Sequence, residues 1–255
     1  MSYKVQKIFP LVALTIVIVT IITIEVVSNL PHLVKVTIPP GLRKEEDAAI
    51  LAKSLHWSAA QEAEFMSASS SPDFSEGVYF PDTYLIPSNE SPTTTANRLI
   101  SNFDDKFAPY EQAALKQNIK WTVLLTLASI IQREAASSSD MSLISGILWN
   151  RLNAKMPLDV DSTVQYARGD TPQGWWAPIT VADLKIDSPY NTYLNVGLPP
   201  HPIDSPGLDA IKAALNPATT KCLYYLHDSN KNIHCSDTYA GQEANVQEYL
   251  KTTSN

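Results

Sequence analysis

The chain has few cysteines and few glycines: two cysteines and eight glycines in 255 residues, against eighteen prolines. Cys222 and Cys235 cannot form a tetrahedral metal site without histidine or acidic ligands, and neither His227 nor His234 has the short spacing of zinc motifs. A zinc site is therefore the weaker alternative. We favour a β-hairpin over residues 223–235 with a polar turn, which brings the two cysteines together as a disulfide or as free thiols.

The chain also lacks any cluster of lysine and arginine, and its formal net charge is -7. A chain of this charge repels a phosphate backbone, so nucleic acid is not an expected partner. The excess of proline over glycine favours ordered loops with fixed turns over flexible linkers. A hydrophobic content of 44% is enough for a folded core in one large domain or two modest ones.

Residues 8–24 form a run of seventeen residues without a charge, rich in Ile, Val and Leu. This run predicts a transmembrane helix, with a cleavable signal peptide as the main alternative. Lys4 and Lys7 favour a cytoplasmic N-terminus, so the chain is expected to be a single-pass protein of the cytoplasmic (inner) membrane. Residues from about 30 onward would then be extracytoplasmic.

Three domains are expected along the chain: the anchor over residues 1–29, a small module over 30–70, and a larger domain over 71–255. The module begins with an alternating strand at residues 34–38, followed by helices at 44–56 and about 59–66. Ser58 and Gln61 have the spacing of a capping box for the second helix. A run of serines ends the module, and residues 75–84 are expected to form a structured loop.

The larger domain is predicted to be mainly helical, which makes the whole chain an α+β protein. Its expected helices are at residues 92–107, 109–116, 121–136, 141–154 and 207–215, with a last helix from about Tyr239. Asp140 is expected to cap the helix at 141–154. Residues 156–205 are mostly loop, and long irregular segments of this kind often form the walls of a binding site.

Glu134 is the candidate catalytic residue. The helix that ends in Gln132-Arg133-Glu134 is apolar on all faces and must be buried, so it holds this carboxylate rigidly at its end. Burial can raise the pKa of a carboxyl group enough to keep it protonated near neutral pH, as a glycosidase acid requires. The alternative is an ordinary solvated glutamate at a helix end, paired with Arg133 or Lys155.

Residues 127–135 resemble the catalytic-helix signature of the YceG-like, or MltG, endolytic murein transglycosylases. Further motifs of that family follow in the same order along the chain, at residues 76–84, 149–152, 156–158, 161–166, 187–193 and 197–200. The resemblance covers roughly residues 75–240, and residues 30–70 resemble the LysM-like module of the family. The resemblance implies a lysozyme-like catalytic domain, for which we expect long loops and a small β-hairpin.

The resemblance also implies a reaction. Members of the family cleave the bond between N-acetylmuramic acid and N-acetylglucosamine in nascent glycan strands of peptidoglycan, leave a 1,6-anhydro end, and need no cofactor or metal. Glu134 would first protonate the glycosidic oxygen and then, as a carboxylate, accept the proton of the C6 hydroxyl. The implied partners are glycan strands, the membrane and a peptidoglycan synthase, beside which the enzyme would end strand elongation.

The resemblance suggests several substrate-binding residues, each with a packing alternative. Their side chains offer hydroxyl, amide, carboxylate or aromatic groups: Glu76, Asp161, Thr163, Gln165, Tyr166, Tyr190, Asn191 and Tyr193. Glu76 could instead hold the loop at 75–84, Asp161 could cap a short helix, and residues 188–191 could be a simple turn. Trp175 and Trp176 could stack on sugar rings or cover the core.

The chain departs from the family pattern at Gln132, where the family commonly has an acidic residue, and around His234, which is therefore not assigned a catalytic role. Two other functions stay open. One is a muramidase-type hydrolase in which Asp159 or Asp161 activates water opposite Glu134. The other is an inactive peptidoglycan-binding scaffold of the cell-wall elongation machinery.

Overall fold

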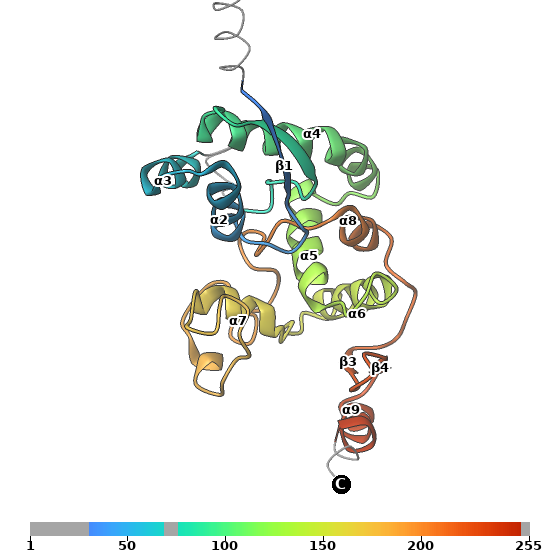
Figure 1. The fold of residues 1–255 in the computed structure, drawn as a ribbon. Helices are drawn as coiled ribbons and strands as arrows, with labels where there is room; N and C mark the ends of the chain where they lie inside the picture. Colours follow the sequence, from blue (N-terminus) through green and yellow to red (C-terminus); the bar gives the residue numbers. More distant parts are fainter. Residues whose placement is uncertain (1–30, 69–75, 251–255) are drawn as a thin grey trace, which may run out of the picture.

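The computed structural model describes residues 31–68 and 76–250, which form an α+β fold dominated by helices (Figure 1). Its first half comprises β1 (Leu33–Thr37), α2 (Lys44–Leu55), α3 (Ala59–Ser67), β2 (Thr83–Pro87), α4 (Pro92–Lys116) and α5 (Trp121–Glu134). Its second half comprises α6 (Met141–Asn153), α7 (Asp161–Arg168), the 3-10 helix η1 (Asp183–Lys185), α8 (Leu208–Leu215), β3 (Tyr224–His227), β4 (Ile233–Ser236), α9 (Tyr239–Asn245) and the π-helical turn η2 (Val246–Leu250).

The predicted strand–helix–helix segment is confirmed as β1, α2 and α3. Ser58 caps α3, and the reciprocal capping box with Gln61 is present. Strand β1 pairs antiparallel with β2, from Leu33 opposite Pro87 to Thr37 opposite Thr83. Strand β2 was not predicted from the sequence, and it overlaps the end of the expected loop at 75–84. The division of the chain at residue 70 stays a prediction.

Helix α4 corrects one expectation. The sequence predicted a helix to residue 107 and another from Pro109, but a single helix runs from Pro92 to Lys116 with Pro109 inside it. Proline removes one backbone hydrogen bond and disfavours helix at the preceding residue. Tertiary packing outweighs this cost, because Phe103 and Phe107 before the proline and Ala114 after it are all buried.

Helix α5 runs through the middle of the molecule, as Figure 1 shows, and contacts α4, α6, α7 and α8. Every residue from 124 to 131 is buried, so the prediction of a helix that is buried on all faces is confirmed. The helix ends at Glu134, and Ala135 leaves it in an extended conformation. The buried part of α5 therefore anchors its last turn, which carries Glu134.

Helix α6 has nearly the predicted bounds, but the predicted cap at Asp140 is wrong: Asp140 makes no side-chain capping hydrogen bond. Its Oδ2 atom lies 3.4 Å from Nε2 of His227 instead, which links the start of α6 to the hairpin. The predicted hairpin is present as β3 and β4, and a disulfide joins Cys222 to Cys235. In the described ranges no group of three His, Cys, Asp or Glu side chains is suited to hold a metal ion.

The apolar run predicted to span the membrane, residues 8–24, lies outside the described residues. Among residues 31–68 and 76–250, no helix is both long enough and apolar enough to cross a membrane.

Candidate active site

The carboxyl group of Glu134 lines a pocket of about 290 Å³ where four parts of the chain meet. Glu134 comes from α5, and the other lining residues come from α6, from the loop before α7 with the first residue of α7, and from the hairpin with α9. The lining residues are Glu134, Arg151, Leu158, Asp159, Asp161, Tyr224, Tyr225 and Gln242. The expected loop region at residues 156–205 contributes Leu158, Asp159 and Asp161, but the walls from α6 and from the hairpin with α9 were not predicted.

Two hydroxyl groups bind the Glu134 carboxyl. The Oγ of Ser162, in the first turn of α7, donates to Oε1 at 2.9 Å, and the hydroxyl of Tyr225, on β3, donates to Oε2 at 2.8 Å. Each carboxyl oxygen therefore has its own partner. Because the partners come from different elements, packing of α7 and β3 against the end of α5 sets the orientation of the carboxyl group.

Burial raises the pKa of Glu134 above its ordinary value, and the negative charge of Asp161 acts in the same direction. The hydrogen bonds from Tyr225 and Ser162 oppose this shift because they stabilise the carboxylate. Arg133 does not neutralise the site: its Nη1 donates to the carbonyl of Gly41, and its guanidinium lies 3.8 Å above the ring of Trp176. The solvated, ion-paired glutamate is therefore not the arrangement observed.

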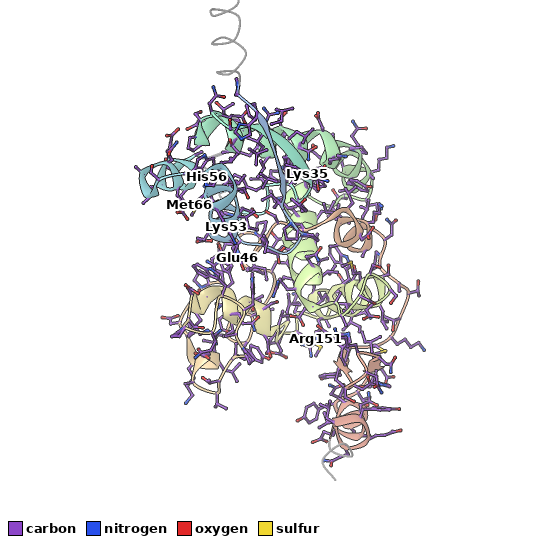
Figure 2. The ribbon with its side chains drawn as sticks, in the orientation of Figure 1. Lys35, Glu46, Lys53, His56, Met66 and Arg151 are labelled. Carbon is purple, nitrogen blue, oxygen red and sulfur yellow. A yellow bond between two sulfur atoms is a disulfide. The ribbon has the colours of Figure 1, made fainter. Side chains whose placement is uncertain are left out.

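Arg151 holds the floor of the pocket together. Its Nη1 donates to the carbonyls of Pro157 and Leu158 and to Oδ2 of Asp159, and its Nε donates to the carbonyl of Leu223 at 2.6 Å. The residue is 7% exposed and lies between α6 and the hairpin (Figure 2). It therefore fixes the loop before α7 and the start of β3 relative to each other.

The two aspartates in the pocket already have partners. Asp159 forms the ion pair with Arg151, at 3.0 Å. Asp161 is the first residue of α7, and its Oδ1 accepts a hydrogen bond of 2.6 Å from the hydroxyl of Tyr193. Asp161 is thus beside the candidate acid, Glu134. Tyr193 is connected to the site by its hydrogen bond to Asp161.

Three of the predicted substrate-binding residues make their hydrogen bonds inside the fold. Thr163 binds the carbonyl of Val160, and Asn191 donates to two backbone carbonyls; both side chains are fully buried. Gln165 donates to the carbonyls of Trp176 and Ala177 rather than lining the pocket. These bonds favour the packing alternative for the three residues, and their contact with substrate stays a prediction.

The remaining predicted residues connect α2 to the loop region around α7. Glu76 is 4% exposed, accepts a hydrogen bond from the backbone N–H of Lys44, and has its pKa raised to about 8, chiefly by burial. Tyr166 and Tyr190 have ring centroids 4.6 Å apart. The guanidinium of Arg43 lies 4.1 Å from the rings of both Tyr166 and Trp175.

Trp176 completes this connection, because its indole N–H donates to Oε2 of Glu46, which points from α2 toward the loops around α7 (Figure 2). The contacts fix the position of α7, and α7 carries Ser162. These contacts therefore support the structure around α7. A direct role of Glu76, Tyr166 and Tyr190 in binding glycan stays a prediction.

Three residues of the site, Ser162, Arg151 and Tyr225, were not predicted from the sequence. Ser162 and Arg151 lie inside the motifs at 161–166 and 149–152, so these motifs contained a signal. Other residues of the motif at 161–166 were selected instead of Ser162, and no residue was selected from 149–152. Tyr225 lies on a predicted strand, and no local pattern shows that this strand packs beside the end of α5. Only the tertiary structure identifies it.

Several known proteins are similar to this chain. The family model of the YceG-like family matches residues 18–248. The chain is 35% identical over 182 residues to the endolytic murein transglycosylase of Streptococcus pneumoniae strain D39, covering 71% of this chain and 33% of that protein. It is 36% identical over 180 residues to the endolytic murein transglycosylase of Bacillus subtilis, covering 69% and 48%.

The chain thus spans about a third to a half of the length of these curated relatives. Its fold matches the crystal structure of the yceG-like protein lmo1499 from Listeria monocytogenes, with a TM-score of 0.74 and 28% identity. That match covers 83% of this chain and 75% of the other. The chain belongs to the YceG-like family.

Proposed function

We propose that the chain is an endolytic lytic transglycosylase that cuts the glycan strands of peptidoglycan between N-acetylmuramic acid and N-acetylglucosamine. The observation that carries this proposal is the state of Glu134: a half-buried carboxyl of raised pKa, open to a pocket and held by two hydroxyl groups. Relatives with 35% and 36% identity are named endolytic murein transglycosylases, which supports the same activity.

Glu134 performs two proton transfers in this mechanism. Protonated at first because burial raises its pKa, it donates its proton to the glycosidic oxygen as the bond to C1 of N-acetylmuramic acid breaks. The resulting carboxylate then accepts the proton of the C6 hydroxyl, whose oxygen closes on C1 to form the 1,6-anhydro ring. Glu134 regains its proton, and no water is consumed.

Tyr225 and Ser162 serve the second half of this cycle. Both hydroxyls donate to the carboxyl oxygens, so they stabilise the charged form that appears after the first proton transfer. They also hold the carboxyl in one orientation, which a residue that serves as both acid and base requires.

A muramidase-type hydrolase is the second candidate, because Asp159 and Asp161 line the same pocket as Glu134. Such an enzyme needs a second carboxylate to activate water or attack C1. The ion pair of Asp159 with Arg151 and the bond of Asp161 to Tyr193 favour fixed structural carboxylates over a free base.

We also propose that the lysozyme-like catalytic domain works outside the cytoplasmic membrane, held by an anchor at residues 8–24 beside a peptidoglycan synthase. The disulfide between Cys222 and Cys235 supports this location, since such bonds persist in oxidising compartments. The segment of β1, α2 and α3 has the element order expected of a LysM-like module, which would help to hold glycan.

Product analysis tests the activity. Purified glycan strands digested by the chain should yield ends that carry 1,6-anhydro-N-acetylmuramic acid, and Glu134→Gln should yield none. Reducing ends alone would establish the hydrolase, and no product from either protein would favour the inactive scaffold.

A further inference from the structure

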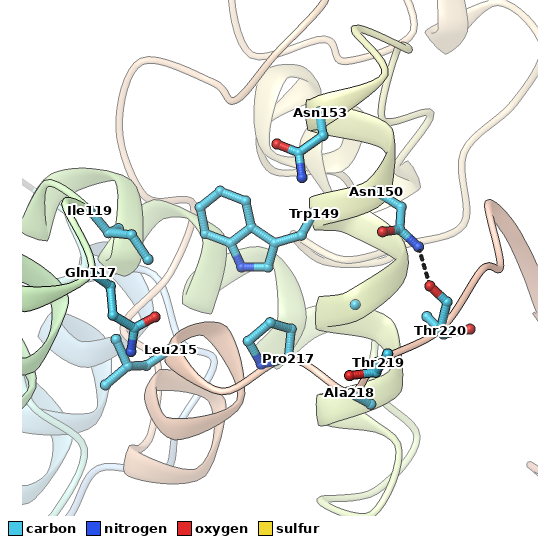
Figure 3. Close-up of a pocket in the computed structure, with 11 residues that line it drawn as sticks. Gln117, Ile119, Trp149, Asn150, Asn153, Leu215, Pro217, Ala218, Thr219 and Thr220 are labelled. Atoms are coloured by element: carbon cyan, nitrogen blue, oxygen red, sulfur yellow. Dashed lines mark hydrogen bonds between the residues drawn. The ribbon is translucent and has the colours of Figure 1, made fainter.

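A second pocket, of about 380 Å³, lies between α6, the end of α4 and the segment that follows α8. Its residues are Gln117, Ile119, Gly146, Trp149, Asn150, Asn153, Leu215, Pro217, Ala218, Thr219 and Thr220. In Figure 3 the indole of Trp149 stands near the centre, between Ile119 and α6. Trp149 and Arg151 are two positions apart, about 200° around a helix, so this pocket and the Glu134 pocket lie on roughly opposite sides of α6.

The walls of this second pocket are held rigidly. A Cβ atom on Gly146 would lie 2.3 Å from the carbonyl oxygen of Ala218, so only glycine allows the segment to approach α6 this closely. The N–H of Ala218 donates to the carbonyl of Ser142 at 2.8 Å. Asn150 donates to the carbonyl of Thr220, the bond drawn in Figure 3. Contacts within the fold therefore fix the walls of the pocket.

The lining offers an aromatic ring and neutral polar groups. The indole N–H of Trp149 is bound to the carbonyl of Ala214 at 3.0 Å, which fixes the ring and leaves only its apolar surface to the pocket. The side-chain amides of Gln117 and Asn153 are exposed and make no hydrogen bond with any other residue in the described ranges. The hydroxyl of Thr219 lies among the lining groups, and none of the lining residues is charged.

We propose that this second pocket binds a neutral N-acetylated sugar unit of a glycan strand, apart from the bond that is cut. An aromatic surface packs against the apolar face of a pyranose, while amide and hydroxyl side chains bind its hydroxyl and acetamido groups. The volume lies within the range of about 300–1,000 Å³ of small-ligand sites. The identity of the sugar rests on the proposed function.

Because the lining of the pocket carries no charge, it fits a neutral sugar better than the charged groups of peptidoglycan. Carboxylates and amines of stem peptides would have to be desolvated without an opposite charge to pair with, which costs free energy. N-acetylglucosamine carries no charge and has an acetamido group that pairs with the amides of Gln117 and Asn153.

The test is an NMR titration of the full chain carrying Glu134→Gln, so that no bond is cut, with N-acetylglucosamine tetrasaccharide as the probe. The indole resonance of Trp149 and the side-chain amide resonances of Gln117 and Asn153 should shift and give a common Kd. Adding Gln117→Ala and Asn153→Ala should raise that Kd about ten-fold or more, as expected when two neutral hydrogen bonds are lost.

Asn97→Ala is the matched control, because Asn97 is an exposed amide on α4 outside this pocket, and it should leave the Kd unchanged. Cellotetraose, which lacks acetamido groups, should bind more weakly. The proposal is wrong if the Trp149 resonance does not respond, if the control weakens binding equally, or if cellotetraose binds as well. These readouts are independent of the anhydro product, so failure of this site and failure of the proposed function are distinguishable.

Discussion

Glu134 and Glu76 are two carboxyl groups whose pKa values are raised chiefly by burial, and they differ in their surroundings. Glu134 opens onto a pocket and binds two hydroxyls, which can rotate to serve either the protonated or the charged form. Glu76 is 4% exposed and binds the backbone N–H of Lys44, a donor that cannot change its role. A raised pKa alone therefore does not identify a catalytic acid.

Glu76 belongs to a buried cluster of acidic side chains where α2 contacts the rest of the protein. Asp47 and Asp204 are fully buried nearby, and neither has a hydrogen-bond partner for its carboxyl oxygens within residues 31–68 and 76–250. Burial raises the pKa of both well above the ordinary value, and neighbouring carboxylates, Glu76 among them, raise them further. Glu76 is therefore expected to affect stability, while Glu134 is expected to affect the proposed reaction. Four experiments test this difference.

The largest effect is expected for Glu134→Gln. The amide has nearly the same shape but cannot transfer a proton, so the rate of anhydro product formation should fall at least about 10³-fold. Thermal unfolding should show an unchanged or slightly higher Tm, and Glu111→Gln on the exposed face of α4 should keep full activity. If Glu134→Gln kept substantial activity, Glu134 would not be the acid.

Tyr225→Phe should lower kcat by about ten- to a hundred-fold, because a hydrogen bond to a charged carboxylate is lost. The bond lowers the pKa of Glu134, so its loss should raise that pKa further. Activity requires protonated Glu134 and falls as the pH rises through this pKa; the alkaline limb of the pH–kcat profile should therefore move to higher pH. Tyr239→Phe, on the exposed side of α9, is the control. An unmoved limb would contradict the role given to Tyr225.

Replacing both Cys222 and Cys235 by serine should have a smaller effect on activity. The disulfide closes a loop with a sequence separation of 13 residues, and its loss should lower the free energy of unfolding by about 3 kcal/mol. Because the hairpin carries Tyr225, kcat should fall about two- to five-fold through less precise positioning. Chemical denaturation and steady-state kinetics measure the two effects; unchanged stability would show that the hairpin is held by packing alone.

The smallest effect on activity is expected for Glu76→Gln. The folded pKa of Glu76, about 8, lies above the ordinary value of 4.5, so the protonated carboxyl group stabilises the folded state at low pH. This stabilisation is lost as the pH rises through about 8. The Tm of the parent should therefore fall between about pH 5 and pH 8. Glu76→Gln should reduce that slope and change kcat less than two-fold; an unchanged slope would assign the pH dependence to Asp47 and Asp204.

Much of the fold was predictable because its signals are local. The capping box at Ser58, the buried helix before Glu134 and the hairpin around the two cysteines all follow from neighbouring residues. The predictions failed where distant contacts decide. Buried aromatic residues keep α4 helical through Pro109, and the hairpin approaches α6 so closely that Asp140 contacts His227 instead of capping its helix.

The position of a carboxylate at the end of a buried helix follows from local sequence, because the apolar run and its polar end are both local properties of the chain. The groups that surround this carboxylate could not be predicted in the same way, because they come from distant parts of the chain. Ser162 and Tyr225 are 28 and 91 positions from Glu134, and they meet it through the packing of α7 and β3 against α5. Burial and hydrogen bonding set the pKa of Glu134, and both depend on these long-range contacts.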